Sequence, residues 1–132
     1  MSPQLRPVQP SHYAIVANWP ESAEATRRWA GPGVPFPLLP ERFAQVLELG
    51  SRPGWALLDE QGTCVGFGQY WMTDARTAHL GRIIVSPLAR GRGLGRLLMQ
   101  ALSAQALGQA DVQQLTLRVY RDNTAAVALY RD

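Results

Sequence analysis

The sequence predicts an α/β fold with a mixed, mostly antiparallel central sheet, helices on both faces and the element order β-α-α-β-β-β-α-β-α. Three observations support this prediction. A length of 132 residues has room for a single domain, residues 1–132. An apolar fraction of 46% beside a charged fraction of 17% is typical of a protein with a packed core. The hydrophobic pattern alternates from about residue 55 and becomes helical after residue 93.

The N-terminal part predicts one edge strand and two helices. The strand covers residues 5–8, and Pro7 confines it to a sheet edge because proline cannot donate a ladder hydrogen bond. The first helix follows with Ser11 as its N-cap and ends before a Trp-Pro pair. Residues 28–40 are rich in proline, which predicts a stiffened loop with a binding surface. The second helix covers residues 40–49.

The middle of the chain predicts three strands. Residues 55–58 and 63–71 are rich in apolar and aromatic residues, and the Asp-Glu-Gln-Gly turn between them indicates a hairpin. Residues 79–85 form the next strand, which ends at a Ser-Pro pair. Cys64 lies in one of these strands and is expected to be a small core residue rather than a nucleophile.

The C-terminal part predicts a helix, a strand and a short helix. Leucine and alanine recur at i, i+3, i+4, i+7 and i+8 from residue 94, so residues 93–107 form an amphipathic helix. Residues 114–119 alternate as a strand does, and residues 123–130 form a final helix capped by an Asp or Asn.

Composition excludes several classes of function. All 13 basic residues are arginine, and the absence of lysine excludes a Walker A loop and a Schiff-base mechanism. One cysteine and two histidines cannot build a zinc site from Cys and His ligands, and we expect no metal. No apolar run reaches the length of a membrane helix, and the N-terminus has no signal core, which predicts a cytoplasmic protein away from membranes. The net charge of +3 suits an anionic ligand without identifying it.

A glycine-rich and arginine-rich loop precedes the strongest helix. Glycines allow the backbone to approach a ligand, and the unpaired N–H groups at the helix start favour phosphate. The loop therefore predicts a site for a ligand that carries a diphosphate. A dinucleotide fingerprint does not fit, because Arg96 stands where the third glycine would be.

Two patterns in this region identify a resemblance. Arg90, Gly93 and Gly95 match [Gln/Arg]-x-x-Gly-x-[Gly/Ala]. Residues 123–130 match Asn-x-x-Ala-x-x-Leu-Tyr, one helix and one strand later. Over residues 54–131 the chain resembles the GNAT superfamily of N-acetyltransferases, and the match in the first 50 residues is limited to the helix layout.

The resemblance implies acetyl-CoA as co-substrate and direct attack by a primary amine of a small molecule or peptide. The pyrophosphate would lie on the amides of residues 91–96. The pantetheine arm would pair with the backbone of the fourth strand, where that strand diverges from the fifth. No covalent enzyme intermediate and no metal are implied. The implied cofactor-binding residues are Ile83, Ile84, Val85, Arg90, Gly91, Arg92, Gly93, Leu94, Gly95, Arg96 and Asn123.

The resemblance also implies candidates for proton transfer. Tyr130 matches the tyrosine that protonates the CoA thiolate, although it could also only pack the last helix. Some ribosomal-protein acetyltransferases of the family carry a glutamate five residues before the Asn of the second pattern. This chain has Arg118 at that position, which argues against a ribosomal N-terminus as substrate. In another branch a glutamate stands eleven residues before the loop pattern, and here that position is His79. His79 is either a general base or a polar residue at a strand end.

In the implied architecture the proline-rich loop overhangs the face of the sheet where the acceptor amine binds. Trp29 and Phe36 in this loop are therefore expected to bind substrate. The family's last β-hairpin is absent from this sequence, either because the form is truncated or because a partner chain supplies the missing strands. In both cases the fifth strand is expected to be an edge, which favours pairing between subunits and a homodimer through it. An acyl-CoA-binding module without catalysis is the alternative function. A nucleic-acid binder is a weaker alternative, because no aromatic-rich basic motif accompanies the arginines.

Overall fold

The computed structural model describes residues 3–109 and 112–117. Its strands are β1 (Gln4–Pro7), β2 (Gly54–Leu58), β3 (Cys64–Met72), β4 (Thr77–Val85) and β5 (Gln114–Leu117). Its helices are α1 (Pro10–Ala17), α2 (Ala23–Ala30), α3 (Phe43–Val46) and α4 (Leu94–Leu107), with 3-10 helices η1 (Pro40–Arg42) and η2 (Pro87–Ala89).

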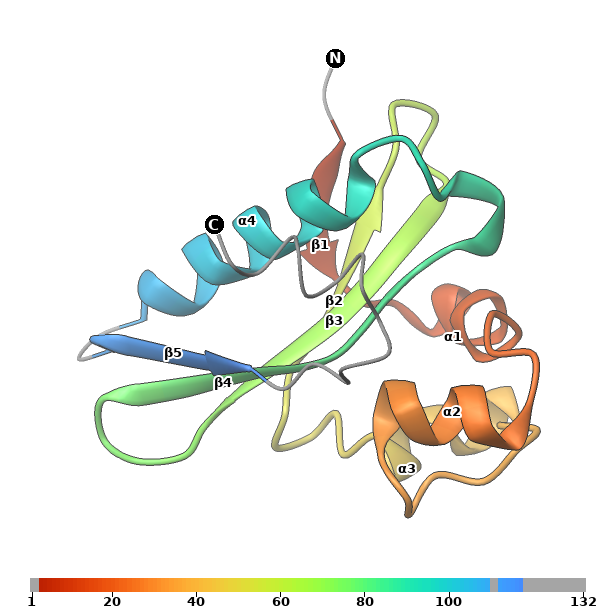
Figure 1. Ribbon diagram of the computed structural model, residues 1–132, viewed down its shortest axis with the longest axis horizontal. Helices are drawn as coiled ribbons and strands as arrows, with labels where there is room; N and C mark the ends of the chain where they lie inside the picture. Colours follow the sequence, from red (N-terminus) through yellow and green to blue (C-terminus); the bar gives the residue numbers. More distant parts are fainter. Residues whose placement is uncertain (1–2, 110–111, 118–132) are drawn as a thin grey trace.

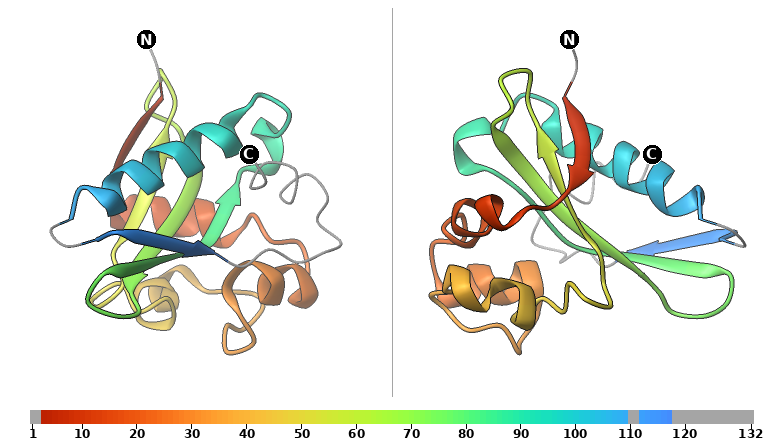
Figure 2. Two further views of the ribbon diagram at one scale, coloured as in Figure 1. Left: turned by 60° about the vertical axis from the view of Figure 1, so that its left-hand side comes forward. Right: turned by 180° about the vertical axis from the view of Figure 1, so that it is seen from behind.

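The five strands form one sheet in the order β1-β2-β3-β4-β5. The first four are antiparallel neighbours, and β4 and β5 are parallel. Helices α1, α2 and α3 lie together on one side of this sheet, and α4 lies on the other (Figure 1, Figure 2). The predicted fold class is therefore confirmed.

An aromatic core fills the space between the sheet and helices α1 to α3. Phe43 and Phe67 are fully buried, and their rings meet edge to face with centroids 5.5 Å apart. Tyr13 stacks on Phe43 at 4.7 Å, and Trp29 meets Phe67 at 6.2 Å. Such aromatic pairs stabilise beyond their buried area. They fix the position of the helical layer over β3.

Two glycines on β3 allow α4 to pack close to the other face. A Cβ added at Gly66 would lie 3.1 Å from Leu98 Cδ2, and one added at Gly68 would lie 2.8 Å from Leu102 Cδ2. Leu98 and Leu102 are themselves fully buried. The sequence therefore uses glycine here to make room for leucine side chains, and α4 is held directly above β3.

A bulge interrupts β4 where it passes the middle of β3. Phe67 pairs with Ile84 but Gln69 pairs with Gly81, so β4 has one residue more than β3 in this interval. Arg82 takes up the extra length with a left-handed backbone, φ 52°. Pairing between β4 and β5 is recorded from Thr77 to Leu80, opposite Gln114 to Leu117, which is the last described residue of β5. A bulge of this kind re-aims the strand.

Helix α2 is the one described helix that the sequence analysis did not predict. It begins at Ser22, whose Oγ accepts the Ala25 N–H at 3.0 Å, and Glu24 pairs with Arg28 across one turn at 3.0 Å. The predicted loop over residues 28–40 is correspondingly shorter, because its first residues are the last turn of α2.

Two predicted helix boundaries also differ. Helix α1 begins at Pro10 with Gln9 as its N-cap, where Ser11 was expected, because the Gln9 N–H donates to His12 Nδ1 at 3.0 Å. The predicted helix over residues 40–49 is shorter and consists of η1 and α3. It ends early because Glu48 adopts a left-handed backbone with φ 61°. The predicted helix over residues 123–130 lies outside the described residues.

We expect Gly68→Ala to lower the free energy of unfolding by about 1–3 kcal/mol, because its methyl group would push α4 away from β3. Urea denaturation measures this change. Gly50→Ala is the matched control, since a Cβ there meets nothing within 4 Å and its φ is not positive. Equal stability of the two variants would contradict the close packing of α4.

Candidate functional site

The loop between β4 and α4 places two glycines in conformations that other residues rarely adopt. Gly91 has φ 84° and Gly93 has φ 73°, and a Cβ at either would meet nothing within 4 Å. The requirement for glycine is therefore one of backbone conformation. Ser86 anchors the start of the loop, because its N–H donates to the Val65 carbonyl at 2.9 Å and its Oγ accepts the Leu88 N–H at 3.3 Å.

The start of α4 offers backbone donors to a ligand. The first hydrogen bond that this helix closes runs from the Leu97 N–H to the Gly93 carbonyl at 3.2 Å. The N–H groups of the preceding residues 94–96 therefore have no acceptor inside the helix. They lie at the positive end of the helix dipole. Such an arrangement suits a phosphate group.

The side chains around this helix start are positive. Arg90, Arg92 and Arg96 are exposed, and the sequence has no Asp or Glu between Asp74 and Asp111. The predicted contact residues Ile83, Ile84 and Val85 are partly buried on the last stretch of β4, directly before the loop. The loop, the helix start and this stretch of β4 are thus contiguous, as a ligand with a diphosphate and an extended arm requires.

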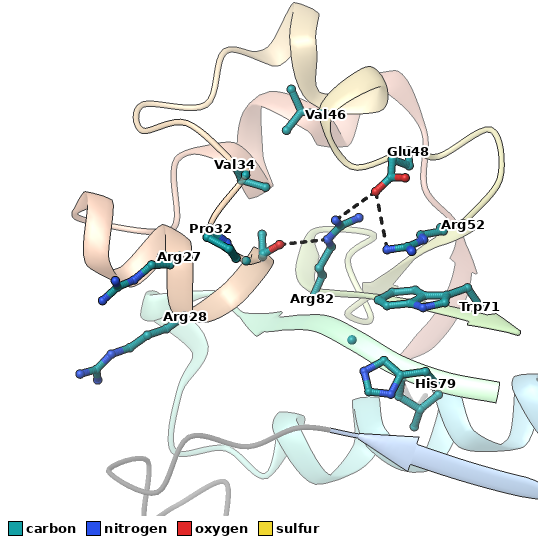
Figure 3. A pocket seen from close by; sticks show the side chains of 15 residues that line it. Arg27, Arg28, Pro32, Val34, Val46, Glu48, Arg52, Trp71, His79 and Arg82 are labelled. Carbon is teal, nitrogen blue, oxygen red and sulfur yellow. Dashed lines mark hydrogen bonds and ion pairs between the residues drawn. The ribbon is translucent and has the colours of Figure 1, made fainter. Parts of the chain in front are cut away.

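A pocket of about 440 Å³ lies on the α2 side of the sheet. Residues 30–34 at the end of α2 form one wall, and residues 79–82 of β4 form another (Figure 3). Segment 46–52 and Trp71 at the end of β3 complete it. The pocket therefore adjoins β4 at the bulge, where the recorded pairing with β5 ends.

Arg82 joins the helical layer to the bulge. Its Nε donates to the Ala30 carbonyl at 3.2 Å, its Nη1 to the Leu47 carbonyl at 2.9 Å, and its Nη2 contacts Glu48 Oε1 at 3.3 Å. The Arg82 carbonyl in turn accepts the indole N–H of Trp29 at 2.8 Å. Burial lowers the pKa of the Arg82 guanidinium, and Glu48 opposes this shift. These bonds position α2 and α3 over β4.

Gln69 on β3 holds the segment that precedes β2 beside the pocket. It is fully buried, and its Nε2 donates to the carbonyls of Leu47 at 2.9 Å and Arg52 at 2.8 Å. Its Oε1 accepts from Arg82 Nη1 at 3.4 Å. A buried amide with both donors and its acceptor satisfied is a fixed point of the structure.

Trp71 lies flat in the pocket because residue 81 is a glycine. A Cβ at Gly81 would be 2.6 Å from Trp71 Cη2. The Arg52 guanidinium lies over the indole at 4.2 Å from its centroid. The His79 ring is 5.2 Å from the indole at 52°, and Figure 3 shows Arg52 above and His79 below Trp71 in that view.

His79 is the predicted candidate base that the structure places in the pocket wall. It lies on β4 beside Trp71, and its Nδ1 is 2.8 Å from Thr116 Oγ1 on β5. The hydrogen bond joins the two parallel strands next to the Leu80–Leu117 pair. An imidazole at this point adjoins both the pocket and the bulge of β4.

A family model for the GNAT acetyltransferase family matches residues 18–132. The chain belongs to this family. A curated relative, mycothiol acetyltransferase from Mycolicibacterium gilvum (strain PYR-GCK), is 35% identical in an alignment of 85 residues that covers 59% of this chain. The chain spans only 28% of the length of that relative.

Solved structures of acetyltransferases share the fold. Spermidine N-acetyltransferase from Vibrio cholerae, in complex with CoA and spermine, aligns over 98% of this chain and 78% of its own, with a TM-score of 0.79 and 19% identity. Aminoglycoside acetyltransferase AAC(6')-Ib, in complex with coenzyme A and kanamycin, aligns over 98% of this chain and 81% of its own, with a TM-score of 0.76 and 19% identity.

The two residues that were predicted to bind the acceptor, Trp29 and Phe36, do not line the pocket of this GNAT chain. Trp29 is only 9% exposed, and its indole packs against Phe67 in the core. Phe36 is 42% exposed, and neither side chain lines the pocket. The backbone segment just after Trp29 does line it, so the loop contributes through residues 30–34. Asn123 and Tyr130 lie outside the described residues.

Sequence reasoning gave no role in a pocket to Glu48, Arg52, Trp71 or Arg82. The pairing of Glu48 with Arg52 at 3.6 Å had a local signal, because the two residues are four apart. The approach of Arg52 to Trp71 had none, because β3 and the segment before β2 meet only in the folded chain. Among the described residues, no group of three potential metal ligands occurs, and no helix has the length and apolarity to cross a bilayer.

Cys64 is expected to be inert in the folded protein. It is 3% exposed, and burial raises the pKa of its thiol to about 11. Because only the thiolate reacts, roughly one thiol in a thousand would be reactive at pH 8. A disulfide reagent should therefore label the native protein very slowly at pH 8 and rapidly in urea. Fast labelling of the native protein would contradict this burial.

Proposed function

We propose that this chain transfers the acetyl group of acetyl-CoA to a primary amine by direct attack. The observation that carries the proposal is the loop over residues 90–96, because it combines two left-handed glycines, amides at a helix start that have no acceptor inside the helix, and exposed arginines. Membership of the GNAT acetyltransferase family supports the same ligand. Acetyl-CoA, when bound, supplies an activated thioester and a thiolate leaving group.

The residues present fit this co-substrate. The amides at the start of α4 would hold the pyrophosphate, and Arg90, Arg92 and Arg96 would add charge-assisted hydrogen bonds to phosphate oxygens. The backbone of β4 from Ile83 to Val85 would pair with the pantetheine arm as an added strand does. The pyrophosphate would then lie at the loop and the thioester would point back along β4 towards the bulge.

The acceptor amine would enter the pocket beside His79. There its nitrogen forms the new C–N bond, the C–S bond breaks, and the nitrogen must lose a proton. We assign His79 as the group that receives this proton, directly or through water, because it lines the pocket beside the bulge. Tyr130, outside the described residues, is proposed to protonate the departing thiolate, and Asn123 to contact the CoA.

The remaining expectations stay predictions. The acceptor is a small-molecule or peptide amine, and the chain works in the cytoplasm. Within the described residues β5 pairs with β4 along one edge, and no strand is recorded along the other. This arrangement supports the predicted homodimer through β5.

Calorimetric titration with CoA and acetyl-CoA tests the loop. We expect binding by the wild-type chain and roughly tenfold weaker binding by Arg92→Gln, because a charge-assisted hydrogen bond is lost. Arg42→Gln is the matched control, since this exposed arginine is in η1, on the side of the sheet opposite α4. Thiol release in the presence of primary amines then tests turnover. Binding without turnover would favour an acyl-CoA-binding module, and no binding would refute the proposal.

The role of His79 has its own test. A general base must be unprotonated, so the rate should rise with pH through its titration and then level off. We expect His79→Gln to lower kcat by about 100-fold or more and to remove this inflection. Glutamine can keep a hydrogen bond to Thr116, so CoA affinity should not change. A kcat within a few-fold of wild type would show that His79 is only a structural residue.

A further inference from the structure

The pocket beside β4 is strongly positive for a site that takes an amine. Four arginines and one carboxylate, Glu48, occur among its described lining residues. With His79 neutral, the lining therefore carries three positive charges in excess. An amine acceptor is itself cationic in water at neutral pH. The lining thus repels the acceptor's own charge unless the acceptor also brings a negative one.

The four arginines differ in what they can do for a ligand. Arg27 and Arg28 extend from α2 away from Trp71 (Figure 3). Arg82 is committed to the fold, because its side chain is only 12% exposed and bonds to Ala30, Leu47, Gln69 and Glu48. Arg52 is the arginine that lies over Trp71 with its side chain 33% exposed.

Arg52 is held in place but is not neutralised. Its guanidinium lies on the indole of Trp71 at 4.2 Å, which fixes its plane. Within the described residues its recorded ion pair is to Glu48 Oε1 at 3.6 Å, and Arg82 contacts the same oxygen at 3.3 Å. One carboxylate therefore serves two guanidinium groups. A guanidinium has five N–H donors in a planar fork, so Arg52 keeps donors for another anion.

We propose that the acceptor is an amine that also carries an anionic oxygen group, a carboxylate or a phosphate, and that Arg52 on the Trp71 face binds that group. The proposal rests on the acetyl transfer proposed above and specifies the substrate class. The planar fork of arginine matches both anions, because each presents two oxygens to parallel N–H donors.

The same charges would assist the chemistry. Positive groups near an ammonium ion lower its pKa, so a larger fraction of bound acceptor is the neutral, nucleophilic amine. The anion on Arg52 offsets the repulsion between the whole acceptor and the pocket. A polyamine would bring further positive charges and no such offset, so the pocket selects against that class.

Matched pairs of amines test the proposal with the wild-type chain. The pairs are 4-aminobutyrate and butylamine, L-phenylalanine and phenethylamine, and 2-aminoethyl phosphate and ethanolamine, with spermidine as the polyamine. Thiol release gives kcat/KM, and calorimetry with CoA-saturated protein gives the affinity of each amine without turnover. We expect at least one anion-bearing member to exceed its partner without an anionic group by about tenfold or more in both measurements. Spermidine should be the poorest acceptor.

Variants at position 52 identify the residue. Arg52→Gln should raise the KM of the preferred acceptor by about tenfold, leave kcat within a few-fold and remove the preference for anions. Arg52→Lys keeps the charge and should restore part of the preference. Arg42→Gln removes the same charge outside the pocket and should change nothing. Thermal unfolding and CoA affinity of each variant separate a folding defect from a loss of recognition.

The outcomes distinguish this inference from the proposed function. If spermidine or the amines without an anionic group are acetylated as well as the anion-bearing amines, acetyl transfer stands and the anionic acceptor is wrong. If no amine is acetylated but anion-bearing amines still bind with a preference that needs Arg52, the pocket inference stands and acetyl transfer is wrong. A preference that persists in Arg52→Gln overturns the role of Arg52.

Discussion

The guanidinium of Arg82 is the interaction on which both parts of the site depend. A buried charge is costly unless it is paired and hydrogen-bonded, and this one meets two backbone carbonyls, a buried amide and a carboxylate. Because Arg82 also provides the left-handed residue of the β4 bulge, one side chain links the strand's change of direction to the placement of α2 and α3. The bulge of β4 and the pocket beside it therefore form together.

Charge is distributed so that β4 separates two regions suited to anions. The loop before α4 offers amides and exposed arginines, and the pocket offers Arg52 on Trp71. The sequence between Asp74 and Asp111, which contains Arg90, Arg92 and Arg96, has no Asp or Glu, whereas Arg52 shares Glu48 with Arg82. The proposed function places a phosphorylated co-substrate at the first region and the proposed anion-bearing acceptor at the second.

The sequence predicted the elements that have a periodic or motif signal and missed those that depend on distant contacts. Helix α4 and the glycine loop were predicted, because the apolar spacing of a helix and the positions of glycines are read from neighbouring residues in the sequence. Helix α2 was missed because its apolar side is short, with Thr26, Trp29 and Ala30 as its buried residues. Trp29 was placed in a loop, although it faces the core from the last turn of that helix. The left-handed backbone of Arg82 has no signal in its residue type.

The side chain of Gln69 holds the segment before β2 through the main chain of that segment. Its amide donates to the backbone carbonyls of Leu47 and Arg52, which every residue type possesses. The path of the chain at position 52 therefore does not depend on which side chain it carries there. Under the proposed role of Arg52, single substitutions at that position would change the selectivity for the group beside the reacting nitrogen, while the backbone contacts of Gln69 would keep the supporting wall in place.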